Sequence, residues 1–323
     1  MTVLRRCIEL LAVTALLGAT AGWAQPYPSK AVHYLSGAST ASGADTLGRL
    51  MAAGLSQTFG QQVVVDNRPG AGGNIVAEAA AKAPADGYTM LQATAAYAVY
   101  ANMYRNLSYD LIRDFAPVTE LAVGPYVVVV HPSLPVKSFP ELIKLAKAKP
   151  GAISYSSAGA GGPTFMAAEL FKAQAGVDML HVPYKGGGPA LNGVVSGEVS
   201  LHFAPVATAV SNIQGGRLRA LAVTAAKPIS MLPDLPTIAD AGLPGYESVN
   251  WYGLLVPAKT PRSTIDTIRG AAISVLNNPT MSKRLNDLGF VVLVNQPEEF
   301  AAYIKLEVER MGKIVKAFNL KPE

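Results

Sequence analysis

Residues 68–75 are the strongest candidate for chemistry in this sequence. They read Arg-Pro-Gly-Ala-Gly-Gly-Asn-Ile and lie between a predicted strand and a predicted helix. The first N–H groups of a helix have no partner within the helix, and they lie at the positive end of its dipole. Glycine also lets a ligand approach the main chain closely. We therefore expect an anion-binding loop at Gly72, Gly73 and Asn74, although a plain strand-to-helix turn explains the same residues equally well.

The spacing of these glycines excludes two familiar phosphate-binding motifs. A dinucleotide site has the pattern G-x-G-x-x-G near the first strand, with an acid about 20 residues later. Gly70, Gly72 and Gly73 do not have this spacing, and no Walker Lys-Ser/Thr pair follows them. The loop therefore predicts neither a dinucleotide site nor a P-loop.

Small and hydroxyl-bearing residues fill three further loops, at residues 37–45, 156–164 and 183–189, each after a predicted strand. In open α/β sheets ligands bind beyond the carboxyl ends of the strands, so several such loops would line one cleft. Asp45, at the end of the first loop, has two interpretations. It binds an amine on the ligand, or it caps its own helix, and the cap is slightly favoured.

The residue patterns that catalysis and metal binding require are missing. No Gly-x-Ser-x-Gly elbow occurs, and the four histidines, His33, His131, His181 and His202, show no i,i+4 pairing. No carboxylate is paired with another in an apolar setting. The single cysteine, Cys7, precedes the predicted mature chain, which excludes a thiolate nucleophile or a Cys-ligated metal. We expect a protein that is not an enzyme and has no metal and no cofactor.

Alternating short apolar runs and amphipathic segments predict βα units that position these loops. Such a rhythm predicts parallel sheets. The predicted strands are residues 31–36, 62–66, 89–93, 126–131, 153–156, 180–182, 200–203, 219–224 and 251–256, and the predicted helices include residues 44–59, 73–83, 262–276 and 297–318. Another helix is opened by the capping box Ser138-Phe-Pro-Glu141.

Length, composition and charge set the class of protein. A chain of 323 residues exceeds what one hydrophobic core usually serves, so we expect two lobes. Half of the residues are hydrophobic and 15% are charged, which excludes a disordered chain. The net charge of +5 is spread over scattered lysines and arginines, which predicts mild attraction of anions and no binding of nucleic acid.

The first 24 residues have the pattern of a cleaved secretory signal. Arg5 and Arg6 precede an almost wholly apolar run at residues 8–21, and Gly22-Trp-Ala24 follows it. The run is shorter than the ~20 residues that span a bilayer, and it contains Glu9. We expect cleavage after Ala24 and a mature chain in the periplasm; a buried N-terminal helix is the alternative.

Seven motifs, spread in order over nearly the whole mature chain, carry a resemblance to a known family: Tyr27-Pro-Ser-Lys30, Val64-Val-Asp-Asn-Arg-Pro-Gly-Ala-Gly-Gly-Asn-Ile75, Lys82-Ala-Pro-Ala-Asp-Gly-Tyr88, Asp114-Phe-Ala-Pro-Val118, His181-Val-Pro-Tyr-Lys-Gly186, Leu218-Arg-Ala-Leu-Ala-Val-Thr224 and Trp251-Tyr-Gly-Leu-Leu255. With these motifs the sequence resembles the tripartite tricarboxylate transporter receptors, also called the Bug or TctC family of periplasmic binding proteins. The resemblance implies a two-lobed α/β fold of type II, in which each lobe is a mixed, mostly parallel sheet flanked by helices.

The resemblance also implies how the chain is divided and what it binds. After the signal at 1–24, lobe 1 comprises residues 25–124 and 249–323 and lobe 2 comprises 125–248, with crossings near Gly124-Pro125 and residues 247–250. A small carboxylate is expected in the cleft, held by loop amides, hydroxyls and water. The expected ligand-binding residues are Ser39, Thr40, Ala41, Ser42, Asp45, Gly72, Gly73, Asn74, Thr94, Tyr97, Ser157, Gly159, Ala160, Gly161, Thr164, Phe165, Tyr184, Gly186 and Ala204.

The sequence departs from the family pattern at several of these positions. The first loop has Gly37-Ala38 where the family has Pro-Phe, and Ala41-Ser42 where it has two glycines. In lobe 2, Phe165 stands where a histidine is frequent, and Ala204 where an aspartate is frequent. These departures suggest a carboxylate with an apolar or aromatic body, unless Phe165 only packs in the core.

Three functions compete on this evidence. The leading one is a transport receptor that delivers its ligand to the membrane permease of a tripartite tricarboxylate transporter. The second is a ligand-sensing input to the ectodomain of a sensor kinase, which the sequence does not distinguish from the first. The third, a periplasmic hydrolase or isomerase, lacks a nucleophile constellation.

Overall fold

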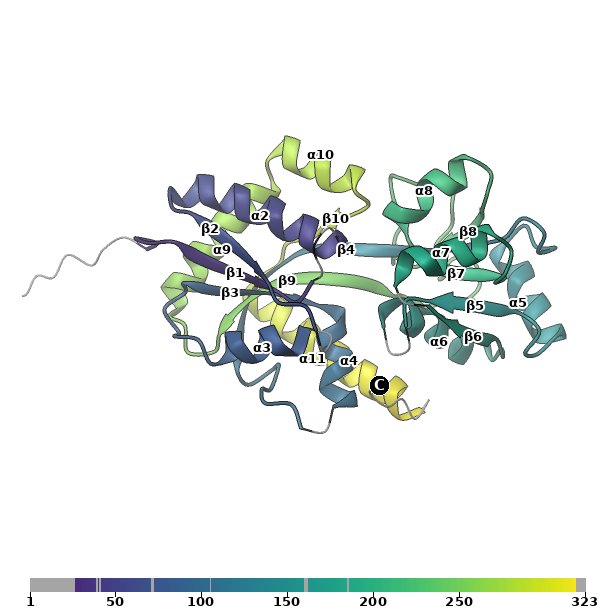
Figure 1. Ribbon diagram of the computed structural model, residues 1–323, viewed down its shortest axis with the longest axis horizontal. Coiled ribbons are helices and arrows are strands. Elements are labelled where there is room, and N and C mark those ends of the chain that lie inside the picture. Colours follow the sequence, from purple (N-terminus) through teal and green to yellow (C-terminus); the bar gives the residue numbers. More distant parts are fainter. Residues whose placement is uncertain are drawn as a thin grey trace, which may run out of the picture.

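The computed structural model describes residues 27–38, 40, 42–70, 73–104, 106–159, 162–184 and 186–317. Its ten strands are connected by hydrogen bonds into one series, which divides within β4 (Phe115–Val130) into two sheets, one in each half of the elongated molecule (Figure 1). We call the half that contains the first three strands lobe 1 and the other half lobe 2. The predicted signal at 1–24, with its cleavage site, lies outside the described residues.

Lobe 1 is built on a mixed sheet that lies between two layers of helices. Its parallel strands are β1 (Val32–Ser36), β2 (Val63–Asn67) and β3 (Thr89–Thr94), in the order β2-β1-β3. The sheet continues with β9 (Val249–Pro257), which pairs antiparallel with β3, and with β4, which pairs antiparallel with β9. The short β10 (Val291–Val292) pairs antiparallel with β4. These strands confirm the parallel sheet predicted from residues 31–36, 62–66 and 89–93.

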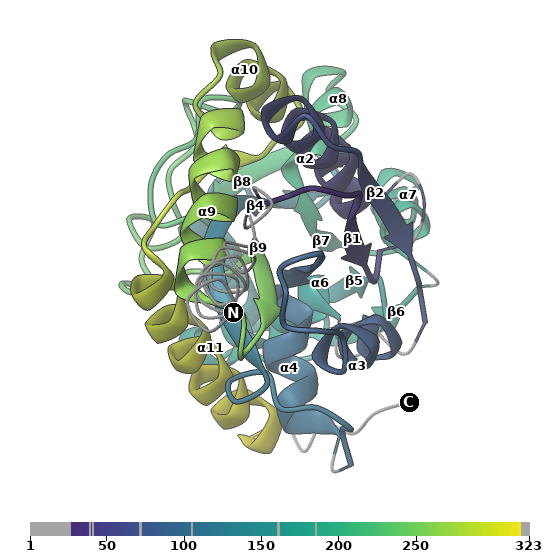
Figure 2. The same ribbon diagram turned by 90° about the vertical axis from the view of Figure 1, so that its left-hand side faces the viewer.

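Two apolar cores hold the helices of lobe 1 to opposite faces of this sheet. On one face lie α2 (Gly43–Phe59), α9 (Arg262–Leu276) and α10 (Pro279–Asp287), with Met51 and Ile268 fully buried. On the other lie α3 (Asn74–Ala81), α4 (Ala95–Met103) and α11 (Pro297–Ala317), with Trp251 and Phe300 fully buried. Figure 2 looks at lobe 1 end on and shows the two groups of helices on either side of the strands.

Lobe 2 repeats this three-layer plan around the far half of β4. The strands β7 (Leu201–Pro205), β5 (Ser154–Ser157) and β6 (Leu180–Pro183) are parallel to one another, and β7 and β8 (Arg219–Val223) flank β4 in antiparallel orientation. Helices α5 (Phe139–Ala148) and α6 (Pro163–Ala175) cover one face, whereas α7 (Gly187–Val195) and α8 (Val206–Gln214) cover the other. The structure confirms the expected fold class.

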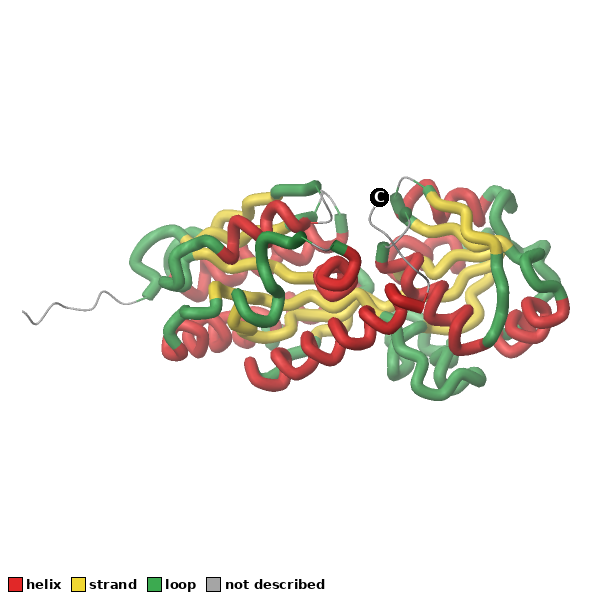
Figure 3. The backbone as a smooth tube through the Cα atoms, turned by 90° about the horizontal axis from the view of Figure 1, so that it is seen from below, coloured by secondary structure: helices red, strands yellow, loops and turns green. Residues whose placement is uncertain are grey.

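The strand β4 belongs to both sheets. Its Pro125 pairs with Val249 of β9 in lobe 1, and its next residue, Tyr126, pairs with Pro205 of β7 in lobe 2. The chain returns to lobe 1 at the start of β9, and Figure 3 shows the strands passing between the two lobes. Ile314 and Val315 near the end of α11 also pack in the core of lobe 2. The division of the chain into units that end at residues 124 and 248 stays a prediction.

Candidate functional site

The strand directions bring the predicted loops of the two lobes face to face. The strand β4 runs from lobe 1 into lobe 2. Because β9 is antiparallel to β4 and β3 is antiparallel to β9, the strands β1, β2 and β3 all point towards lobe 2. Because β7 is antiparallel to β4 and parallel to β5, the strands β5, β6 and β7 point towards lobe 1. The carboxyl ends where ligands bind in such sheets therefore face each other.

Six helices begin at this junction within the described part of the chain. Ser42 caps α2 there, with Asp45 in its first turn, and the other five have no side-chain cap. Their N-cap residues are Gly73 (α3), Thr94 (α4), Gly162 (α6), Gly186 (α7) and Pro205 (α8), and their first turns contain no acidic residue. Away from the junction, Ser138 caps α5 and Asn278 caps α10, whereas α9, after Pro261, has no side-chain cap. The positive ends of five helix dipoles, with N–H groups that no side chain satisfies, are suited to bind an anion.

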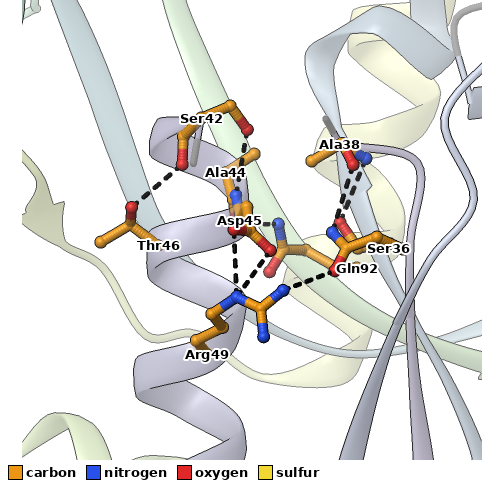
Figure 4. A network of polar contacts seen from close by, with 9 residues as sticks. Ser36, Ala38, Ser42, Ala44, Asp45, Thr46, Arg49 and Gln92 are labelled. Carbon is orange, nitrogen blue, oxygen red and sulfur yellow. Dashed lines mark hydrogen bonds and ion pairs between the residues drawn. The ribbon is translucent and has the colours of Figure 1, made fainter. Parts of the chain in front are cut away.

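A polar network joins the start of α2 to β2 and to Ala38 after β1. Ser42 caps α2 by accepting from the backbone N–H of Asp45, and the buried Asp45 carboxylate pairs with Arg49 at 3.0 Å (Figure 4). Arg49 also donates to Oδ1 of Asn67, whose Nδ2 donates to the carbonyl of Ala38. Asp45 therefore ties α2 to β2 and to the loop. Its binding to a ligand stays a prediction.

The glycine loop after β2 packs closely against the loop after β1. A Cβ at Gly37 would lie 2.6 Å from Cα of Gly73, so only glycine fits this contact. Gly73 has φ 93°, and the Tyr97 hydroxyl donates to its carbonyl at 3.2 Å. Tyr109 donates to Oδ1 of Asn74, and the buried Nδ2 of Asn74 has no hydrogen-bond partner among the described residues. Gly73, Asn74 and Tyr97 thus form one group at the start of α3.

The other predicted residues of lobe 1 are placed as follows. Thr94 is half-buried at the end of β3, and its hydroxyl does not cap α4. Thr40 is exposed in a turn. Ser39, Ala41 and Gly72 lie outside the described residues, as do Ala160 and Gly161 of lobe 2.

In lobe 2, Ser157 and Thr164 hold the loop that leads into α6. The buried Ser157 hydroxyl contacts both the carbonyl and the N–H of Gly159, and Oγ1 of Thr164 accepts from the N–H of Ala158 at 3.0 Å. Gly159 has φ 131°, in the region that favours glycine. These hydroxyls therefore shape the loop from within.

Phe165, Tyr184 and Ala204 are placed in the packing of lobe 2. Phe165 is 7% exposed in one core and Ala204 is fully buried in the other. The Tyr184 hydroxyl lies under α7, where a Cβ on Gly193 would come within 2.4 Å of it, while its N–H donates to the carbonyl of Ser157. Gly186 has φ 111° and begins α7. Contact of these four residues with a ligand stays a prediction.

Sequence reasoning missed His181. Its ring stacks on Tyr155, its register partner in the neighbouring strand β5, with centroids 4.9 Å apart. Its Nε2 lies 2.7 Å from Oγ of Ser157. The contact depends on the pairing of β5 with β6, which no local pattern in the sequence gives.

No group of three or more histidine, aspartate or glutamate side chains within the described ranges is arranged to hold a metal ion. None of the helices between residues 27 and 317, as far as these are described, is both long enough and apolar enough to cross a membrane.

We expect Thr164→Val to weaken ligand binding about tenfold, because it leaves the N–H of Ala158 without its acceptor in a half-buried loop. Valine keeps the shape of the side chain, so the change isolates one hydrogen bond. Calorimetric titration measures the effect, with Thr267→Val on the exposed face of α9 as the control. Unchanged affinity in Thr164→Val would show that this loop does not contribute to binding.

Two sheets with facing carboxyl ends and two connecting strands define a class of protein, the two-lobed binding proteins that hold a solute between their lobes. The model of the family described as the tripartite tricarboxylate transporter family receptor matches residues 47–320. The chain belongs to this family, which confirms the resemblance seen in the sequence.

Individual proteins agree with this assignment. A UPF0065 protein from the tcbD-tcbE intergenic region of Pseudomonas sp. (strain P51) is 36% identical over 295 residues, covering 91% of this chain and 88% of the relative. A solved structure described as a periplasmic transporter is 40% identical, with a TM-score of 0.79 over 92% of this chain and all of that chain. The R. palustris protein Rpa4515, solved with adipate, is 34% identical, with the same TM-score and coverage.

Proposed function

We propose that this protein is a periplasmic receptor that captures a small carboxylate between its lobes and delivers it to the permease of a tripartite tricarboxylate transporter. The observation that carries the proposal is the convergence of five helix N-termini without side-chain caps. A carboxylate supplies the acceptor oxygens and negative charge that these N–H groups and dipoles lack. No arginine clamp is needed for such a site.

The class of carboxylate follows from a relative and from the site. Rpa4515 was solved with adipate, a dicarboxylate with an aliphatic body. Helix N-termini from both lobes offer anion-binding ends on opposite sides of the junction, which suits a ligand with a charge at each end. We therefore propose linear dicarboxylates as the first class to test. Carboxylates with an aromatic body come second, because Phe165 and Ala204, the two residues that suggested such a body, are buried.

Binding without catalysis is the function that the site favours. The Ser157 hydroxyl contacts His181, as in a nucleophile and base, but Ser157 is fully buried and already contacts two backbone atoms of Gly159. A nucleophile has to reach the substrate, which this hydroxyl does not do here. The net charge of +5 further favours an anionic ligand.

A thermal-shift screen of mono-, di- and tricarboxylates, with amines and sugars as controls, tests the proposal. A ligand present at about 100 times its Kd should stabilise the protein by ~2.7 kcal/mol. Calorimetry on the best compound should then give one site per chain. A screen in which sugars or amines stabilise the protein and no carboxylate does would refute the proposal.

The choice between permease and sensor kinase needs a cellular experiment. Deletion of the receptor should abolish uptake of the radiolabelled carboxylate if it serves a permease. Retained uptake, together with loss of ligand-induced transcription, would favour the sensor instead.

A further inference from the structure

His181 lies directly behind the loop that leads into α6, and its ring is held on two sides. Tyr155 stacks on it at 4.9 Å with an interplanar angle of 23°, and Phe165 of α6 contacts it at 4.7 Å. The Tyr155 hydroxyl donates in turn to Glu169, which pairs with Lys172 at 2.9 Å. The imidazole therefore has little freedom to move away from Ser157.

The contacts of the Ser157 hydroxyl bear on whether Ser157 or His181 donates the hydrogen between Oγ and Nε2. This oxygen lies 2.7 Å from Nε2 of His181, 3.0 Å from the carbonyl oxygen of Gly159 and 3.2 Å from the N–H nitrogen of Gly159. A hydroxyl has one hydrogen and two lone pairs. The carbonyl can only accept and the N–H can only donate, so all three contacts are hydrogen bonds at once only when the hydroxyl hydrogen goes to the carbonyl. In that arrangement the remaining lone pair accepts from His181, whose Nε2 then carries a hydrogen.

The same contacts extend to the start of α6. The carbonyl of Gly159 also accepts from the N–H of Gly162, the N-cap residue of α6. A continuous path of hydrogen bonds thus links His181, Ser157, Gly159 and Gly162. The path ends at one of the helix N-termini that the proposed function assigns to the carboxylate.

We propose that His181 is a positioning residue of the ligand site, which donates from Nε2 to Ser157 and thereby fixes the loop and the N-terminus of α6. The assignment of the ligand rests on the proposed function, but the positioning of the loop does not. A donating imidazole also leaves Ser157 unactivated, since a general base would have to accept from it. The pair therefore serves recognition and not acyl transfer.

Three substitutions separate this role from simple packing. His181→Gln places an amide nitrogen near the position of Nε2, His181→Asn is too short to reach Ser157, and His181→Leu has no donor. All three lose the stack on Tyr155, so the loss of packing is common to them. The glutamine and asparagine variants have the same amide group and differ by the one methylene that carries it within reach of Ser157.

Hydrogen–deuterium exchange of the unliganded protein is the first measurement. In the peptide that covers residues 155–166 we expect His181→Gln to exchange within about twofold of the wild type, and His181→Asn and His181→Leu to exchange at least about tenfold faster. The affinity for adipate, measured by calorimetry, should follow the same order.

Equal exchange in the glutamine and asparagine variants would overturn the proposal, as would a wild-type rate in all three. Ester hydrolysis by the wild type that is lost in Ser157→Ala would overturn it too, since it would assign the pair to catalysis. If adipate does not bind to the wild type but the exchange rates separate as expected, the positioning role stands and the proposed ligand is wrong.

Discussion

Replacing Glu120 with glutamine should raise the free energy of unfolding at pH 8 by up to about 3 kcal/mol. Glu120 lies on β4, 3% exposed, and burial raises its pKa to about 7. The hydrogen bond from Asn295 opposes this shift, whereas the charges of Glu247 and Glu307 add to it. Above pH 7 the folded protein must therefore keep a charge in a buried place, with Oε1 lacking a partner among the described residues.

The direction of the pH dependence follows from the raised pKa. Between the ordinary value of 4.5 and about 7 the unfolded chain loses this proton while the folded protein keeps it, so stability falls as the pH rises through this window. The gain from Glu120→Gln should be largest above pH 7 and small at about pH 5. Urea unfolding at both pH values measures it, with the exposed Glu309→Gln as control. A loss of stability at pH 8, or the same gain at both values, would contradict the raised pKa.

Gly73→Ala should destabilise the protein by about 2–4 kcal/mol and reduce carboxylate affinity by about a hundredfold. Gly73 has φ 93°, which costs any other residue backbone strain. A Cβ there would also lie 2.8 Å from the hydroxyl of Tyr97 and 3.4 Å from Cα of Gly37. The two loops would be forced apart where α3 presents its N–H groups.

Two further variants separate strain from crowding at this position. Gly60 has φ 65° with nothing within 4 Å of its Cβ position, so Gly60→Ala measures the backbone strain alone. Tyr97→Phe, made in the Gly73→Ala protein, removes the crowded hydroxyl and should recover part of the stability that Gly73→Ala loses. Calorimetry and urea unfolding are measured on all four proteins. If Gly73→Ala costs no more than Gly60→Ala and binds normally, the loop is a plain turn and not an anion site.

The sequence predicts the positions of the loops well because the chemistry of their residues is local. Glycines and hydroxyl residues at 37–45, 68–75 and 156–164 interrupt apolar runs, and the structure places each of these loops at the carboxyl end of a strand. The capping box at Ser138 and Glu141 predicts the start of α5, where Ser138 accepts from the N–H of Glu141. The helix predicted at residues 262–276 matches α9.

Features that depend on tertiary pairing escaped sequence reasoning. Only residues 126–131 of β4 read as a strand, because Pro117, Gly124 and Pro125 are typical of loops. In the structure β4 runs from Phe115 to Val130, with irregular register near Pro117. The stack of His181 on Tyr155 likewise requires β5 and β6 to be neighbours in register, and no local pattern gives that pairing.

Small-angle X-ray scattering with and without the carboxylate that most stabilises the protein tests the central claim, that the ligand is held between the two lobes. A ligand touched by both lobes favours their closed arrangement, because the open one offers only half of the contacts. We expect the radius of gyration to decrease at saturating ligand, through bending near Pro125 and at the start of β9. An unchanged scattering profile, with binding confirmed by calorimetry on the same sample, would contradict capture by closure of the lobes.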